Sequence, residues 1–229
     1  MRAGEEREGA DQRLPVRAAQ AIWYNLPVLL AMDLVLLAGA VPAAALLFGG
    51  GSLLAPLVAA LTLGPLWAGV VASADGMVRD EAIGVRAFAN NVRRFARRGV
   101  AVSLLPAAVV TAIVGTLGLL EASPGSRWLF VPLFVDGSVA TLLVVAGFSA
   151  FSLATTGGLG GWHLWRTSLA VAAAGPMATV GTLALLVLLG FLCGWAGPGL
   201  LPFLPAPFAV YLSAITWNTV SGASYPGVR

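Results

Sequence analysis

Two acidic side chains lie inside long apolar runs of the sequence, where a carboxylate is the residue type best suited to ion or proton chemistry. Asp33 belongs to the run 21–48, and Asp136 belongs to the run 129–154. If these runs cross a bilayer, an ionised carboxylate within them is costly, so each side chain must face a cavity, find a partner or be protonated. Asp33 lies about 18 Å into its run at about 1.5 Å per residue, which is near the bilayer midplane.

Each carboxylate has a functional and a structural interpretation. Asp33 is either an ion or proton coupling site, or a structural residue hydrogen-bonded to Ser, Thr or backbone groups of a neighbouring helix. Asp136 either shares a polar cavity with Asp33 or is an interfacial carboxylate that water reaches. Its depth, close to the expected headgroup boundary, favours the second interpretation for Asp136.

The charged stretch 75–98 is the other feature whose residue types suggest a function. Its six arginines are Arg79, Arg86, Arg93, Arg94, Arg97 and Arg98. At about 100° per residue, four apolar residues share one helix face, namely Val85, Phe88, Val92 and Phe95. The arginines Arg86, Arg93 and Arg97 lie roughly opposite. This pattern predicts a basic amphipathic helix in a cytosolic loop at the membrane surface. It is either a topogenic signal that binds anionic lipid headgroups, or a docking face for an acidic cytosolic partner.

The remaining reactive residue types form no catalytic or metal-binding pattern that we recognise. His163 stands between Trp162 and Trp165, an arrangement typical of an interfacial aromatic belt. Cys193 is the single cysteine, so neither a disulfide within the chain nor a cysteine metal cluster is expected. We therefore expect no enzyme activity, no cofactor and no metal.

The amino-acid composition indicates the class of protein to which these residues belong. Hydrophobic residues make up 59% of the 229 positions and charged residues only 10%, whereas a soluble domain carries about 25% charged residues. The sequence therefore predicts an all-α, polytopic transmembrane helical bundle. The net charge of +3 comes from arginines beside apolar runs, so attraction to anionic lipid explains it without a nucleic-acid partner.

The apolar runs predict a single membrane domain over 21–220, between a cytosolic N-terminal tail at 1–20 and a C-terminal tail at 221–229. The six expected spans are about 21–48, 53–74, 100–120, 129–154, 167–193 and 200–220. Five spans is the alternative, because the last run is short and follows several prolines. The Gly- and Pro-rich segment 194–207 is expected to dip into the membrane. The small residues Gly64, Ala68 and Ala72 predict close approach by another helix.

The arginines also predict the orientation. With both termini cytosolic, twelve of the thirteen arginines lie inside and only Arg127 lies outside. This distribution is a strong positive-inside signal. We therefore expect a multi-pass protein with both ends in the cytosol.

The stretch 62–99 resembles the signature region of the YesL-like family of small bacterial integral membrane proteins of unknown function. The features that carry the resemblance are Gly64–Pro65, the small-residue helix Ala68–Ala74, the charged loop Arg79–Glu81, Phe88 and Phe95 with Arg93–Arg98, and Asn25 near the first span. The resemblance covers about a quarter of the chain. It implies a bacterial inner-membrane protein with an accessory role in carbohydrate transport, and it carries over no catalytic residues.

Three classes of function remain open from the sequence. A non-enzymatic accessory or regulatory subunit fits the surface helix and the resemblance; its partners would be the lipid bilayer and a transporter subunit. A small transporter or channel would need Asp33 and Asp136 to line one path, in a homo-oligomer such as a dimer. An intramembrane enzyme ranks last, because the sequence offers no candidate nucleophile, base or metal cluster.

The predicted orientation is tested with reporter fusions at Ala89 and Ser123. We expect Ala89 to report the cytosol and Ser123 the opposite side, because the run 100–120 separates them. The same sidedness at both positions would overturn the span assignment. A fusion at Arg127 serves as a control that should agree with Ser123.

Overall fold

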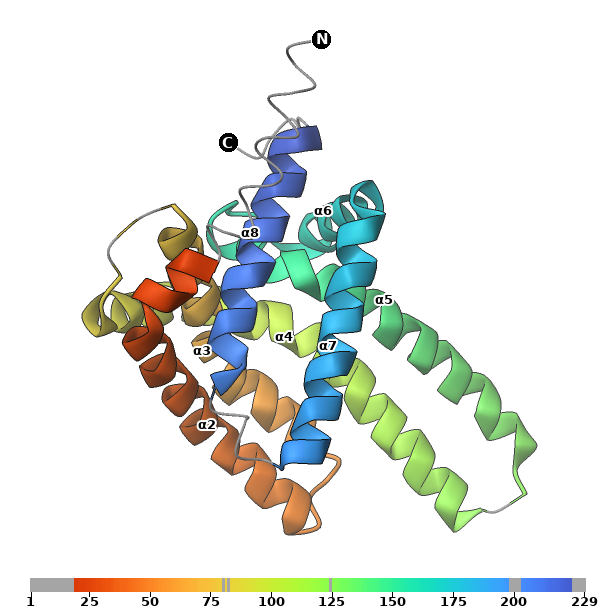
Figure 1. Cartoon of the computed structure of the whole chain (residues 1–229). Coiled ribbons are helices and arrows are strands. Elements are labelled where there is room, and N and C mark those ends of the chain that lie inside the picture. The colour runs from red at the N-terminus through yellow and green to blue at the C-terminus, as the bar shows by residue number, and fades with distance from the viewer. Residues whose placement is uncertain (1–18, 80, 82, 124, 198–202, 224–229) are drawn as a thin grey trace.

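The computed structural model describes residues 19–223 apart from 80, 82, 124 and 198–202. All secondary structure in this described part is helical, which confirms the predicted all-α class (Figure 1). The elements are α2 (Leu26–Phe48), α3 (Ala55–Val78), α4 (Val85–Ala122), the 3-10 turn η1 (Arg127–Leu129), α5 (Phe130–Thr155), α6 (Gly161–Ala174), α7 (Pro176–Ala196) and α8 (Pro205–Ala223). The predicted tails at 1–20 and 221–229 lie almost entirely outside the described residues.

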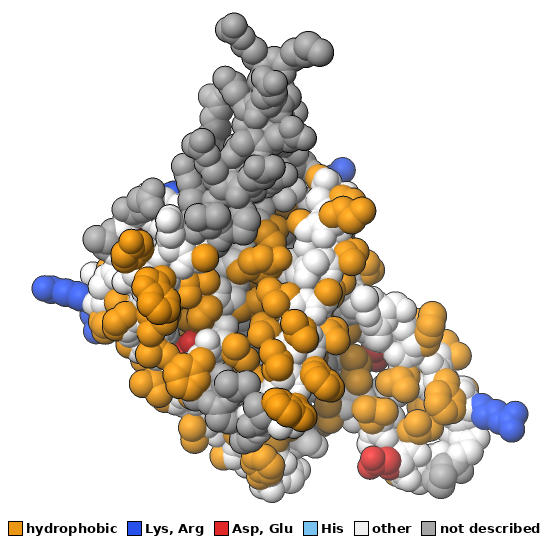
Figure 2. Space-filling view, viewed as in Figure 1, with side chains coloured by type: hydrophobic (Ala, Val, Ile, Leu, Met, Phe, Trp, Pro, Cys, Tyr) orange, Lys and Arg blue, Asp and Glu red, His pale blue; other side chains and the backbone are white. Residues whose placement is uncertain are grey.

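Five of these helices are long and apolar enough to cross a membrane: α2, α3, α4, α5 together with η1, and α7. Many large apolar side chains on them are exposed, among them Phe48 and Met177 at 92% and 87%. Figure 2 shows such side chains spread over most of the visible face, with arginines projecting at its edges. A soluble protein rarely exposes so much contiguous apolar surface, whereas lipid covers it. The chain is therefore built as a membrane-embedded protein.

Three helix boundaries differ from those expected from the sequence. The basic segment and the third span form one 38-residue helix, α4, so that span does not begin separately near residue 100. Helix α3 continues to Val78 and therefore includes Asp75, which was expected in the loop. The predicted fifth span, 167–193, is divided at Gly175 into α6 and α7. Pro176 explains this break, because proline favours the first turn of a new helix.

The most extensive helix contact joins α3 and α4. A Cβ atom added to Gly99 would lie 2.3 Å from the carbonyl oxygen of Gly64, so the two backbones touch through glycine. Ala68 and Ala72 are buried on the same face of α3, where they pack against Phe95. The predicted small-residue stripe thus does admit a close helix, and its partner is α4.

The first half of α4 is attached to the bundle by its apolar face. Phe88 and Phe95 are buried at 4% and 8% exposure, and Val92 packs against the core. Val85, the remaining residue of the predicted apolar face, lies in the first turn of the helix with its side chain 57% exposed. The opposite face carries Arg86, Arg93, Arg94 and Arg97, all of them exposed.

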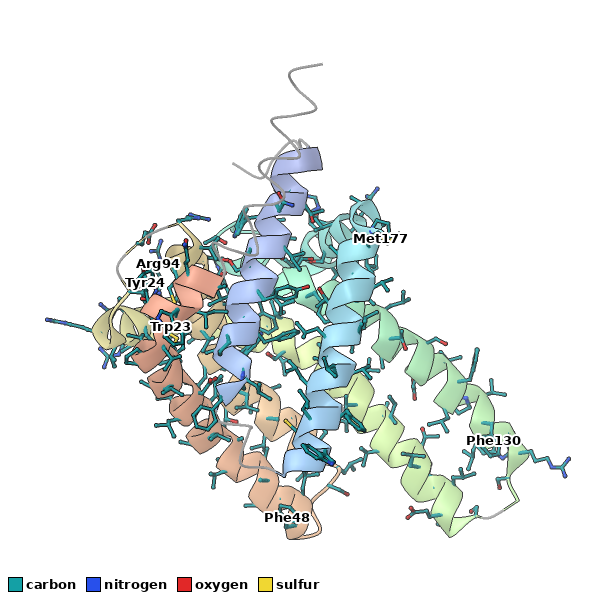
Figure 3. All side chains as sticks on the ribbon, in the orientation of Figure 1. Trp23, Tyr24, Phe48, Arg94, Phe130 and Met177 are labelled. Atoms are coloured by element: carbon teal, nitrogen blue, oxygen red, sulfur yellow. The ribbon has the colours of Figure 1, made fainter. Side chains whose placement is uncertain are left out.

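Exposed aromatic residues lie at both ends of the helical bundle. The hairpins α2–α3 and α4–α5 diverge from each other toward their tips (Figure 1). Trp23, Tyr24 and Arg94 lie at one end of the bundle, whereas Phe48 and Phe130 lie near the hairpin tips (Figure 3). Exposed aromatic residues at both ends are typical of helices that meet two membrane interfaces.

In the described part, α7 makes its largest contact with α6.

The glycine contact predicts that Gly99→Ala destabilises the protein by about 1–3 kcal/mol, the usual range for overpacking. The added methyl would meet a backbone oxygen, which cannot rotate away as a side chain does. Gly118→Ala on the same helix is the matched control, because nothing lies within 4 Å of its added Cβ. Denaturant unfolding in detergent micelles measures both variants. Equal stability of Gly99→Ala and the wild type would show that α3 and α4 are not so closely packed.

Candidate functional site

The most heavily hydrogen-bonded side chain of the described structure is the carboxylate of Asp75, which lies three residues before the end of α3. Its side chain is fully buried. On Oδ1 it accepts hydrogen bonds from Ser152 Oγ at 3.4 Å, from Trp217 Nε1 at 3.0 Å and from Ser213 Oγ. On Oδ2 it accepts one from Thr156 Oγ1 at 2.7 Å. Donors from α5 and α8 thus converge on one residue of α3.

Further polar contacts surround this carboxylate at the same end of the bundle. The Arg79 guanidinium lies 5.1 Å from the centre of the Trp217 ring, in cation–π geometry. On α4, Asn91 Nδ2 donates to Ser73 Oγ at 3.0 Å. Arg98 donates to the carbonyl oxygens of Ala154 and Thr155 at the end of α5, where a cation also complements the helix dipole. Together these contacts join four helices in one polar layer.

The geometry around Asp75 is that of a structural junction. A buried carboxylate is tolerated when hydrogen-bond donors replace the water it has lost. Four donors on the two oxygens of Asp75 achieve this. Such a site holds α3, α5 and α8 in register, and both oxygens have protein partners.

Asp33 is the second buried carboxylate, with 1% of its surface exposed. Its Oδ1 accepts the backbone N–H of Ala206 at 2.7 Å. Ala206 lies in the first turn of α8, where backbone N–H groups have no partner within the helix and favour an anion. Oδ2 is buried and has no hydrogen-bond partner among the described residues. The sequence analysis offered a structural role for Asp33, as a carboxylate hydrogen-bonded to a neighbouring helix. This role explains Oδ1 but not Oδ2.

A cavity of about 780 Å³ adjoins Asp33. Its walls come mainly from α2, α3 and α4, and Phe151 and Pro205 complete them. Most of the lining side chains are apolar. The cavity extends along α2 from Asp33 to Leu47, close to the α2–α3 turn.

The structure does not bring Asp136 to this site. Asp136 is half-buried on α5 and is not among the residues that line the cavity next to Asp33. The shared polar cavity considered for the two carboxylates is therefore not found. His163 is exposed on α6. Within the described residues, no three His, Cys, Asp or Glu side chains gather closely enough to hold a metal ion.

Sequence reasoning missed Asp75 because its charge was grouped with the arginine-rich stretch that follows it. A usable signal was present: Asp75 stands three residues after Ala72 and seven after Ala68, so all three share one helix face. That face was already expected to meet another helix. An acidic residue on a face that packs against other helices must be buried, and it then requires donors.

Comparison of the chain with protein-family models, with curated proteins and with solved structures found no match. The function therefore has to be argued from the geometry of the chain itself. Its class is defined by the fold: a polytopic helical membrane protein with two buried carboxylates, one fully paired and one half-paired.

The junction predicts that Asp75→Ala costs about 2–4 kcal/mol of stability, because it leaves buried donors such as Trp217 Nε1 without an acceptor. Asp136→Ala is the control and should change stability by less than about 0.5 kcal/mol, since Asp136 makes no comparable contacts. Unfolding in detergent gives both values, and the tryptophan emission of Asp75→Ala should shift as Trp217 loses its acceptor. A wild-type unfolding midpoint for Asp75→Ala would contradict the junction.

Proposed function

We propose that the chain is a non-enzymatic accessory or regulatory subunit of the bacterial inner membrane, and that it docks an acidic cytosolic partner on the arginine face of α4. This face consists of Arg86, Arg93 and Arg97. The observation that carries the proposal concerns the apolar face on the opposite side of the same helix segment. That face is packed against the protein, which leaves the arginine face as the exposed one.

An interfacial lipid-anchor helix buries its apolar face among the acyl chains. In α4 the large residues of that face, Phe88 and Phe95, are instead buried in the protein. The segment therefore cannot insert into lipid by this face, although its arginines still attract headgroups. Of the two interpretations of the basic stretch, docking is the one that the packing favours.

The arginine face is also held rigidly. The hydrogen bond from Asn91 to Ser73 fixes the middle of the segment. The close contact between Gly99 and Gly64 and the bonds from Arg98 to the end of α5 fix its C-terminal end. A surface that is already ordered loses less conformational entropy when a partner binds. Long arginine side chains on a fixed backbone suit carboxylates, which guanidinium groups bind in a bidentate manner.

The proposed topology has six spans, with α8 as the sixth, and both termini in the cytosol. The arginine face then lies inside with the Trp23 and Tyr24 end of the bundle (Figure 3). The resemblance to the YesL-like family supports a role beside carbohydrate uptake systems. A transporter that uses Asp33 and Asp136 has less support, because the cavity at Asp33 does not reach Asp136.

The proposal predicts that replacing Arg86, Arg93 and Arg97 together by Gln weakens binding of polyglutamate to the protein in phosphatidylcholine nanodiscs by roughly tenfold. Three exposed ion pairs at about 0.5 kcal/mol each correspond to that factor. Arg127→Gln is the matched control, because Arg127 lies at η1 at the other end of α4, and it should bind as the wild type does.

The same variant has a cellular readout. A photo-crosslinking residue at Asn90, which is exposed on this segment, should capture a partner in the wild type and lose it in the triple Gln variant. Membrane insertion is checked by fractionation. A Gln variant that inserts normally, keeps every crosslinked protein and retains all cellular function would refute docking and leave the topogenic interpretation.

A further inference from the structure

The cavity beside Asp33 has the size and the lining of a ligand site. Its volume of about 780 Å³ falls within the range of about 300–1,000 Å³ typical of small-molecule pockets, which are mostly apolar with a few placed polar groups. The lining residues with polar side-chain atoms are Asp33, Ser52, Ser103 and Trp67, whose indole carries one N–H donor. Ser103 already donates to Gly99 of its own helix at 2.8 Å, and Ser52 lies exposed at the α2–α3 turn.

Asp33 is the polar group at the opposite end of this cavity from Ser52. One of its oxygens is bound by the Ala206 N–H, and the other lacks a partner among the described residues. A buried oxygen without a donor is costly, and a native structure usually satisfies it with protein, water or ligand. Asp33 is 1% exposed and is one of the residues that line the cavity, so the cavity is the open space next to this oxygen.

The charges of the cavity define the chemistry of that donor. Among the residues that the structure describes, no arginine lines the cavity, and none of the lining side chains carries a charge that compensates a carboxylate at Asp33. A hydroxyl group would donate a hydrogen bond to Asp33 but would leave the negative charge of the carboxylate uncompensated. An anionic lipid group would be repelled by that charge. An ammonium group supplies both a donor and a compensating charge. The apolar walls require that the rest of the molecule be hydrophobic.

We propose that this cavity binds a lipophilic amine, with its ammonium group on Asp33 Oδ2 and its apolar body between α2, α3 and α4. The walls come mainly from α2, α3 and α4, which are long and apolar enough to cross a membrane, so such a molecule enters from the hydrocarbon phase. Asp33 thereby acts as a binding residue as well as the acceptor for the first turn of α8.

The test uses the full chain in phosphatidylcholine nanodiscs and radiolabelled dodecylamine as the probe. We expect saturable binding that unlabelled dodecylamine displaces at least tenfold more effectively than dodecanol or dodecanoate, which share its chain length. Asp33→Asn keeps an acceptor for the Ala206 N–H and loses the charge, so it should weaken binding at least tenfold. Asp136→Asn is the matched control and should bind as the wild type does.

A second variant addresses the cavity without altering the carboxylate. Ala40 lines the cavity, and Ala40→Phe should abolish binding by filling it, while a wild-type unfolding temperature shows that the fold persists. Equal displacement by dodecanol and dodecylamine would overturn the proposal, because it indicates apolar partitioning alone. Wild-type affinity in Asp33→Asn, or in a folded Ala40→Phe, would overturn it as well.

Discussion

The need to hydrogen-bond a buried carboxylate governs the arrangement of this helical bundle. Asp75 lies in an apolar helix with its side chain fully buried, and an unsatisfied charge there would cost several kcal/mol. Ser152, Ser213 and Trp217 can reach it only if α5 and α8 take fixed positions along α3. The glycine contact of α3 with α4 then places the arginine face relative to the same junction. The position of the arginine face is therefore tied to the same polar centre through α3.

Two buried aspartates on the neighbouring helices α2 and α3 have different roles, and they differ in the number of hydrogen-bond donors that reach them. Asp75 receives four hydrogen bonds, with a donor on each oxygen, whereas Asp33 receives one and borders a cavity. Helix α8 contributes to both, through Ala206 in its first turn and through Ser213 and Trp217 further along. Carrying these polar partners makes α8 less apolar than the other long helices. Helix α8 is not among the five helices whose length and composition indicate a membrane span.

Sequence patterns captured properties set by local chemistry and missed those set by contacts between helices. The helical class, the burial of Asp33 and the small-residue stripe of α3 followed from hydropathy and spacing. The continuity of α4 did not, because Gly99 resembles a helix terminator until Gly64 is known to lie against it. Val85 fits the apolar face by periodicity, yet it stands in the first turn, beyond the packed surface. The donors of Asp75 come from residues 77 to 142 positions away, a separation over which periodicity carries no information.

The dependence of both carboxylates on α8 has a consequence for biogenesis. Translation runs from the N-terminus, so α2 and α3 enter the bilayer while α8 is still unsynthesised. During that interval Asp33 lacks the Ala206 N–H, and Asp75 has only the hydroxyl donors of α5. The nascent bundle thus holds two acids without their full set of hydrogen-bond donors. Arrival of α8 supplies the missing donors to both carboxylates at once, so the last helix completes the polar contacts of the first two.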